Sequence, residues 1–232
     1  MSLLKEVFEI SAKNAYFLKG NEQAEKSLRE VVDLVNDIID HMHALLKTLG
    51  DRFSRGESAF AATMIHMVMP LSYGILYNLM IGNLPACYFH MRIILEGLTK
   101  SIIADIRFPE YSFFEYKLEC LENLLSETRL SFSKMCNLLL PKIINRENTT
   151  TIIELWKDLS EKWAHAGGIV KKVVEKIVRE ESPPPWSIII PVEYDDRDLS
   201  DLQELASYVK SIRRIIHILV ETWRSAYRNH ET

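Results

Sequence analysis

Turn-forming residues and cysteines are scarce in this sequence of 232 residues, which has eight glycines, eight prolines and three cysteines. So few glycines and prolines, clustered at a few places, favour long helices over a sheet-rich fold with many turns. Cys87, Cys120 and Cys136 are widely spaced, and they form neither a C-x-x-C pair nor a zinc-type pattern with histidine. An odd, sparse set of this kind is typical of a reducing compartment. The first ten residues also lack the apolar core of a signal peptide, so we expect a cytoplasmic protein.

Neither sign of charge dominates, because 28 Lys and Arg stand against 32 Asp and Glu for a net charge of −4. A mildly acidic chain is not typical of a dedicated nucleic-acid binder, since phosphate binding depends on clustered Lys and Arg. The hydrophobic fraction of 47% is enough for a substantial core. We expect a single helical domain over residues 1–232, with nucleic acid as a partner only through a local basic patch. Two glutamines beside many Ile, Glu and Lys is a composition also seen in thermophilic proteins.

A run of 34 residues from Ser58 to Met91 has no Asp, Glu, Lys or Arg. Part of this run is long and apolar enough to cross a membrane. It contains His66, Pro70 and Asn78, however, and no flanking cluster of Lys and Arg sets an orientation. We interpret it as a buried central helix with a kink at Pro70, which removes a backbone donor. The sequence therefore predicts no membrane span.

Helical periodicity covers most of the chain. Residues 22–49 and 199–227 carry apolar residues at heptad spacing, as on the wide apolar face of a long helix in a bundle. The segment 182–198 contains a Pro triplet and "SIIIPVEY", and we expect it to be extended, either as an apolar lid or paired with a second chain. The sequence predicts an all-α bundle of about seven helices with a Pro-rich insertion before the last. The other helical segments are 3–19, 57–81, 85–107, 111–139, 151–165 and 169–180.

Charge returns after the long run at Arg92, and Glu96 follows one helical turn later. Side chains four residues apart share a helix face, and Lys100 and Arg107 continue that face. These residues therefore fit a solvated stripe with intrahelical ion pairs. The alternative is a cleft between helices, where a buried pair has to satisfy its own hydrogen bonds. The sequence leaves both interpretations open.

Two segments of the chain resemble a family of prokaryotic all-helical domains of unknown function, loosely related to the HEPN superfamily. In "LYNLMIGNLPACYFHMRIILEGLTKSI" a Gly-containing turn precedes a helix with small residues and Arg-x-x-x-Glu, and "DLSEKWAHAGG" matches a later Ser…His segment. The resemblance covers about residues 60–170 and implies a helical bundle, of which some are ribonucleases or toxin partners. Carried onto the matching positions, it supports a constellation of Arg92, Glu96 and His165, but it does not carry nuclease activity across. We take these three as the candidate catalytic residues, with Ser160 and Lys100 as candidate binding residues.

The chain departs from nuclease-type HEPN domains, which carry an Arg and a His five to seven positions later on one helix. Only Arg224 and His230 have such a spacing here, close to the end of the sequence, where helices fray. His165 precedes two glycines, so a helix end stabilised by the helix dipole is the simpler explanation of this histidine. A His against a carboxylate could also act as a general acid or base, or bind an anion together with Arg.

Two further segments have residue types that metal ions use. Asp40 and His43 have the spacing of one of the two Glu-x-x-His motifs that di-metal bundles use. The heptad places both residues outside the apolar face, however, and the sequence has no second motif of this kind. The acidic residues of "EYDDRDLSD" lack the glycine and the closing glutamate of a calcium loop, and carboxylates at a helix start explain them. We therefore expect neither a metal nor a cofactor.

The sequence favours a helical bundle with an interaction or regulatory role, which forms a homodimer or binds another protein. Long heptad faces, the unpaired "SIIIPVEY" segment and the lack of a complete catalytic signature support this hypothesis. The first alternative is a HEPN-like ribonuclease or nucleotide-processing enzyme that uses Arg92, Glu96 and His165. The second is a bundle that senses a small ligand in an apolar pocket near Met64–Met69.

Overall fold

The computed structural model describes residues 3–161 and 192–229, which are helical almost throughout. No strand occurs within these two ranges, in agreement with the predicted all-α class. The predicted helix over residues 169–180, and residues 182–191 of the insertion, lie outside them. The described elements are α1 (Leu3–Gly20), α2 (Glu22–Leu49), α3 (Asp51–Ser54), α4 (Ala59–Thr63), the π-helix η1 (Met64–Val68), α5 (Met69–Met80), α6 (Leu84–Arg107), α7 (Phe114–Thr128), α8 (Phe132–Leu139), the 3-10 helix η2 (Leu140–Lys142), α9 (Arg146–Leu159), the 3-10 helix η4 (Asp196–Asp198) and α11 (Leu199–Asn229).

The described helices are slightly more numerous than the seven or so expected from the sequence. The loop after α2 contains the single-turn α3. The helix predicted over residues 111–139 is divided into α7 and α8, because Arg129 at the end of α7 has a left-handed backbone (φ 51°) that turns the chain. The bundle architecture is therefore as predicted, and the number of helices is corrected.

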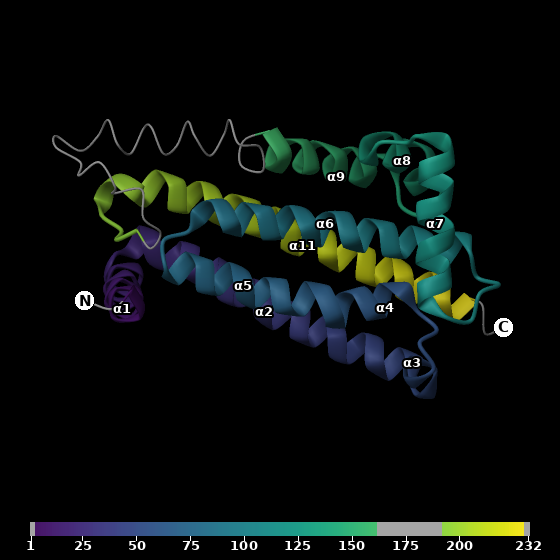
Figure 1. Cartoon of the computed structure of the whole chain (residues 1–232), viewed down its shortest axis with the longest axis horizontal. Coiled ribbons are helices and arrows are strands. Elements are labelled where there is room, and N and C mark those ends of the chain that lie inside the picture. Colours follow the sequence, from purple (N-terminus) through teal and green to yellow (C-terminus); the bar gives the residue numbers. More distant parts are fainter. Residues whose placement is uncertain (1–2, 162–191, 230–232) are drawn as a thin grey trace.

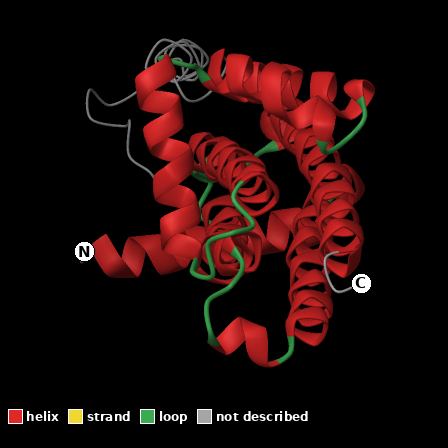
Figure 2. Cartoon of the chain, turned by 90° about the vertical axis from the view of Figure 1, so that its right-hand side faces the viewer, coloured by secondary structure: helices red, strands yellow, loops and turns green. Residues whose placement is uncertain are grey.

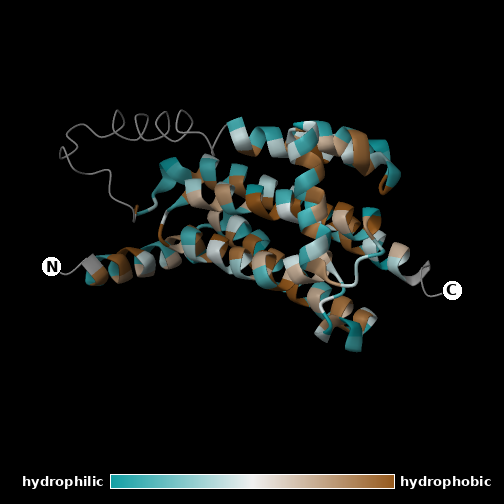
Figure 3. Cartoon of the chain, turned by 45° about the vertical axis from the view of Figure 1, so that its right-hand side comes forward, coloured by the Kyte–Doolittle hydropathy of each residue, from teal (hydrophilic) through white to brown (hydrophobic). Residues whose placement is uncertain are grey.

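Two long helices from opposite parts of the chain, α2 and α11, lie side by side and run in the same direction (Figure 1). Arg213 of α11 holds them together, since its Nε donates to Asp37 Oδ2 and its Nη1 to Glu30 Oε2, both at 2.7 Å. α5 and α6 pack against them as an antiparallel pair, and α1 and α7 cross at opposite ends of this body (Figures 1 and 2). In Figure 3 hydrophobic and hydrophilic residues alternate along these helices, as expected of helices with one buried face. The shared core includes Leu34, Ile38, Leu79, Leu95, Val209 and Trp223.

The charge-free helix runs without interruption from Ala59 to Met80. Where the sequence predicts a kink at Pro70, the structure has a π-helical turn over Met64–Val68. Pro70 has no N–H to donate, and the wider turn just before it lets the Met69 N–H reach the Met64 carbonyl. The π-turn therefore accommodates the missing donor while the helix continues.

A buried carboxylate joins four helices at the α7 end of the body. Asp105 of α6 accepts hydrogen bonds from Ser58 Oγ at 2.6 Å and from the first two backbone N–H groups of α4 at 2.8 and 3.1 Å. Trp223 Nε1 of α11 donates at 2.8 Å, and Lys117 Nζ of α7 forms an ion pair at 3.2 Å. Both charged side chains are almost fully buried. Their mutual contact is therefore necessary, because a buried charge without a partner is costly.

The described end of the insertion is anchored to its own chain. The Val192 N–H donates to Ile81 O at 3.1 Å, and the Tyr194 hydroxyl donates to Leu79 O at 2.8 Å. Asn14, buried on α1, accepts from the Tyr194 N–H at 2.8 Å and donates to the Val192 carbonyl at 2.8 Å. The sequence left open whether "SIIIPVEY" covers its own chain or pairs with a second one. Its described residues pack against their own chain.

The last residues of the predicted insertion are helical instead of extended. Asp196–Asp198 form η4, and Asp195 caps it by accepting from the Arg197 N–H at 2.8 Å. The Asp198 carboxylate in turn accepts from the Asp195 N–H at 3.1 Å, which completes a capping box. The acidic cluster at this position therefore begins the last helical element, as expected of carboxylates at a helix start.

Candidate functional site

The face of α6 that carries Arg92 and Glu96 meets α9, and both side chains are half-buried. Of the two interpretations that the sequence left open, the contact between helices therefore applies to Arg92 and Glu96, and the plain solvated stripe does not. The contact residue on α9 is Trp156, whose indole Nε1 donates to Glu96 Oε2 at 3.4 Å. Trp156 also stacks on Phe132 of α8, with ring centroids 4.8 Å apart. The sequence could not select Trp156, since it is one of several apolar residues on the same helix.

Arg92 has an unusual environment for a half-buried cation. Its guanidinium carbon lies 5.3 Å from the centre of the Trp156 ring, within the range of a cation–π contact. Its Nε is buried and has no hydrogen-bond acceptor among the described residues. No ion pair of Arg92 with a described carboxylate occurs either, although Glu96 is one turn away. The guanidinium therefore keeps donors that an anionic group could use.

Glu96 is bound by other partners. Lys100 Nζ lies 3.2 Å from Glu96 Oε1 and 3.0 Å from Glu122 Oε1 of α7, so it bridges two carboxylates. Burial lowers the pKa of Lys100, but the hydrogen bond to Glu122 and the charge of Glu96 outweigh it and the pKa is raised overall. Burial, with a smaller effect of Glu96, raises the pKa of the nearby Cys136 thiol to about 12, which keeps it protonated at neutral pH. Lys100 thus neutralises Glu96 in place of Arg92.

The remaining members of the predicted site are only partly placed. Ser160 is buried, and its hydroxyl donates to the Trp156 carbonyl at 2.7 Å within its own helix. Its Oγ is therefore bonded to the backbone, in a structural role. His165 and His230 lie outside the described residues. The structure thus brings Arg92, Glu96, Lys100 and Trp156 together, and leaves the position of His165 open.

Asp40 and His43, the pair considered for a metal, are both exposed on α2, and two neighbouring residues of that helix are engaged with α11. Asp37 is bonded to Arg213, and His41 packs against His217 with ring centroids 5.5 Å apart. No group of three or more potential metal ligands occurs in residues 3–161 and 192–229. The acidic segment before α11 forms the capping box of η4. The seam between α2 and α11 thus accounts for Asp37 and His41, and helix capping accounts for the acidic segment.

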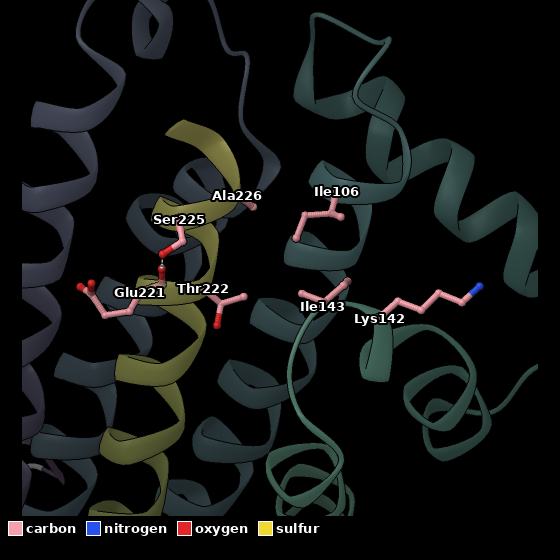
Figure 4. A pocket seen from close by; sticks show the side chains of 7 residues that line it. All are labelled: Ile106, Lys142, Ile143, Glu221, Thr222, Ser225 and Ala226. Carbon is pink, nitrogen blue, oxygen red and sulfur yellow. Dashed lines mark hydrogen bonds between the residues drawn. The ribbon is translucent and has the colours of Figure 1, made fainter. Parts of the chain in front are cut away.

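A surface pocket of about 440 Å³ lies beside the C-terminal half of α11. Figure 4 shows Thr222 and Ala226 facing Ile106 and Ile143 across it, while Lys142 extends away. The Ser225 hydroxyl is bonded to the Glu221 carbonyl, so it is not directed at the opening. This pocket is distant in sequence from the Met64–Met69 segment where a ligand cavity was considered. There, Met67 lies so close to Gly97 that a Cβ at this glycine would meet its terminal methyl group.

A second candidate surface is the outer face of the charge-free helix. His66, Pro70, Tyr73 and Tyr77 are exposed on one side of it, at spacings of four, three and four residues. Tyr77 is 70% exposed. By length and composition, Ala59–Met80 is also the single helix in the described ranges that could cross a membrane, a test that core helices of soluble proteins pass as well. This face differs from the surfaces of the other long helices, all of which carry charged residues.

Comparisons with protein-family models, with curated proteins and with solved structures give no match for this chain.

Proposed function

We propose that this chain is a cytoplasmic interaction module that forms a homodimer through the outer face of its charge-free helix. The observation that carries the proposal is the stripe of His66, Pro70, Tyr73 and Tyr77, which is exposed and has no charged neighbour along its own helix. Surfaces that bind proteins are enriched in aromatic residues and depleted of charge at their centre. Protein interfaces also favour Tyr, because its ring is large and rigid and its hydroxyl remains polar.

The rest of the molecule supports an interaction role over a catalytic one. Three charged side chains are buried among the described residues. Asp105 and Lys117 neutralise each other and join helices, and Asp198 caps η4. Cys87 and Cys136 are buried free thiols, which suits a reducing compartment. A homodimer with two-fold symmetry uses the same patch on both copies, so the patch has to be complementary to itself. A helix face without charged residues of its own suits this condition, since like charges on that helix do not approach each other across the axis.

The decisive experiment compares two exposed tyrosines by size-exclusion chromatography with light scattering at micromolar concentration. Tyr77→Glu places a charge in the face, whereas Tyr116→Glu alters a tyrosine of similar exposure (58%) on α7. We expect dimers for the wild type and for Tyr116→Glu, and monomers for Tyr77→Glu. A monomeric wild type contradicts the proposal. Sedimentation of the wild type with phosphatidylcholine vesicles, lost in Tyr77→Glu, would assign the same face to a membrane surface instead.

A second candidate function is a HEPN-like ribonuclease or nucleotide-processing enzyme that uses Arg92, Glu96 and His165. The specific observation in its favour is Arg92, a half-buried guanidinium over Trp156 with an Nε that has no acceptor in the described residues. A phosphate oxygen is a suitable ligand for such a group. Glu96, however, is neutralised by Lys100, which leaves it poorly suited to act as a base.

Labelled single-stranded RNA tests this second candidate. The wild type, Arg92→Ala and His165→Ala are incubated with it, and Arg129→Ala is a control that removes a cation at the end of α7. Cleavage by the wild type and by Arg129→Ala, but not by the other two, would support the enzyme. The absence of cleavage in every sample would remove it. The third hypothesis, ligand sensing, is supported if a small molecule co-purifies with the chain.

A further inference from the structure

The first half of α1 has an apolar stripe that is exposed in the described part of the structure. Leu4 and Phe8 are 65% and 67% exposed, and they lie one helical turn apart. No residue between Leu4 and Lys13 is buried, whereas Asn14 and Leu18 in the second half are fully buried. The second half is therefore packed on the body and the first half projects from it.

The figures show the same arrangement. In Figure 2, α1 extends away from the other helices, on the side opposite to the C-terminal end of α11. In Figure 3 it again extends beyond the bundle at the end labelled N. Its packed half contacts α2 and, less extensively, α5. Asn14 and the Lys13–Glu193 ion pair, 2.7 Å long, fix the point from which the first half projects.

The size of the charge-free face indicates that a dimer needs a second contact. The exposed residues of this helix run from His66 to Tyr77 and span about 18 Å, so with a width of roughly 10 Å they form a strip of about 180 Å². A stable protein–protein interface buries about 800 Å² on each partner. The strip alone provides less than half of this area. Another apolar surface of the same chain has to take part.

We propose that the second copy in the dimer covers this face with the projecting half of its α1, so that each copy's Leu4 and Phe8 pack beside Tyr73 and Tyr77 of the other. This inference rests on the proposed dimer and specifies how it is built. Both surfaces occur once per chain, so a two-fold axis satisfies them reciprocally. Glu6 lies on the side of the helix opposite to Leu4 and Phe8, and the Lys5–Glu9 pair flanks the apolar stripe, where both charges can stay in water at the rim of the contact.

Cross-linking between differently tagged chains tests the contact directly. One chain carries Phe8→Cys and the other Tyr77→Cys, both with Cys120→Ser, because Cys87 and Cys136 are already buried. We expect a short bis-maleimide to join the two tagged chains in high yield. The control pairs Phe8→Cys with Tyr116→Cys on α7, where we expect no product above background. A dimer by light scattering that gives no Phe8–Tyr77 product overturns the arm contact.

Charge substitutions separate this inference from the proposed dimer itself. The double variant Leu4→Glu/Phe8→Glu is compared with Tyr16→Glu, an exposed tyrosine in the packed half of α1. We expect the double variant to raise the dimer dissociation constant at least tenfold and Tyr16→Glu to leave it unchanged. If Tyr77→Glu is monomeric while the double variant dimerises like the wild type, the dimer face stands and the arm is wrong. If the double variant does not fold by circular dichroism, the cross-linking result decides.

Discussion

Lys117 and Asp105 form a buried ion pair between α7 and α6, with Nζ and Oδ1 separated by 3.2 Å. The same ammonium group donates to the Glu57 carbonyl at 2.7 Å, just before α4. The carboxylate also binds the start of α4 and the indole of Trp223. The pair therefore has nearly all its hydrogen-bonding positions filled, which is the condition under which a charge tolerates burial.

We expect Asp105→Ala to lower the free energy of unfolding by about 3–5 kcal/mol, because it leaves the Lys117 ammonium buried without its partner. Urea unfolding followed by circular dichroism measures this change. Glu122→Ala is the matched control, since Glu122 forms an exposed ion pair with Lys100 and such pairs contribute about 0–1 kcal/mol. Equal effects of the two variants would contradict the central role of Asp105.

A double-mutant cycle should reveal the coupling between the two charges. Asp105→Asn and Lys117→Met each leave one buried charge unbalanced, whereas the double variant leaves none. We expect the double variant to be more stable than the sum of the single effects predicts, by about 1–3 kcal/mol. Additive effects would mean that the hydrogen bonds to α4 and Trp223, and not the ion pair, stabilise this junction.

Two glycines provide a test of how the insertion is held. Gly82 has a φ of +73°, and a Cβ there would meet the carbonyl oxygen of Val192. Gly82→Ala should therefore cost at least about 1–2 kcal/mol from the backbone conformation alone, and more from the displaced segment. Gly20→Ala has open space around it at the end of α1, and should be neutral or stabilising by up to about 1 kcal/mol. Thermal unfolding of both variants measures the difference.

Histidines in the seam and between α5 and α6 should make the fold less stable in mild acid. Burial lowers the pKa of His41, with a further contribution from His217, although Asp37, Glu221 and Asp40 oppose it. Burial also lowers the pKa of His90. Above the unfolded pKa of about 6.5 both states are neutral, so the full stability is present. As pH falls below it, the unfolded chain binds protons first, and stability is lost as pH approaches the folded pKa.

Urea unfolding of the wild type and of His41→Gln at pH 7.5 and pH 5.0 measures this effect. We expect the loss of stability between the two pH values to be smaller in His41→Gln than in the wild type. His43→Gln, two positions further along the same helix, is the control. Its loss of stability between the two pH values should equal that of the wild type. A larger loss in His41→Gln would indicate that the acidic neighbours of His41 dominate over its burial.

The elements that could be predicted are those whose burial follows from the order of residues along one helix. The heptads of α2 and α11 predicted their core faces, because a single helix determines which positions share a side. Asp105 could have been noticed in the same way, since Leu98, Ile102 and Asp105 follow the core period of α6. Its partners could not, because Ser58, Lys117 and Trp223 are brought to it only by the packing of four helices.

The candidate site shows the same limit. The sequence correctly placed Arg92, Glu96 and Lys100 on one face of a helix, and the resemblance pointed to residues near the end of α9. That the face meets Trp156 depends on how α9 crosses α6, which no spacing within either helix determines. Glu96 pairs with Lys100 and not with Arg92, and this choice depends on side-chain geometry that the spacing of residues does not determine. The projecting half of α1 is recognised only once the body is known.

The parallel pairing of α2 with α11 also has a consequence for the order in which the chain can fold. Arg213 and Glu30 are 183 residues apart in sequence, and Tyr194 and Asn14 are 180 apart. Contacts between such distant residues require closure of very long loops and are expected to form late. On the ribosome, the apolar face of α2 therefore has to wait until residues 199–229 have been synthesised, and during that time it is a surface on which chaperones can act.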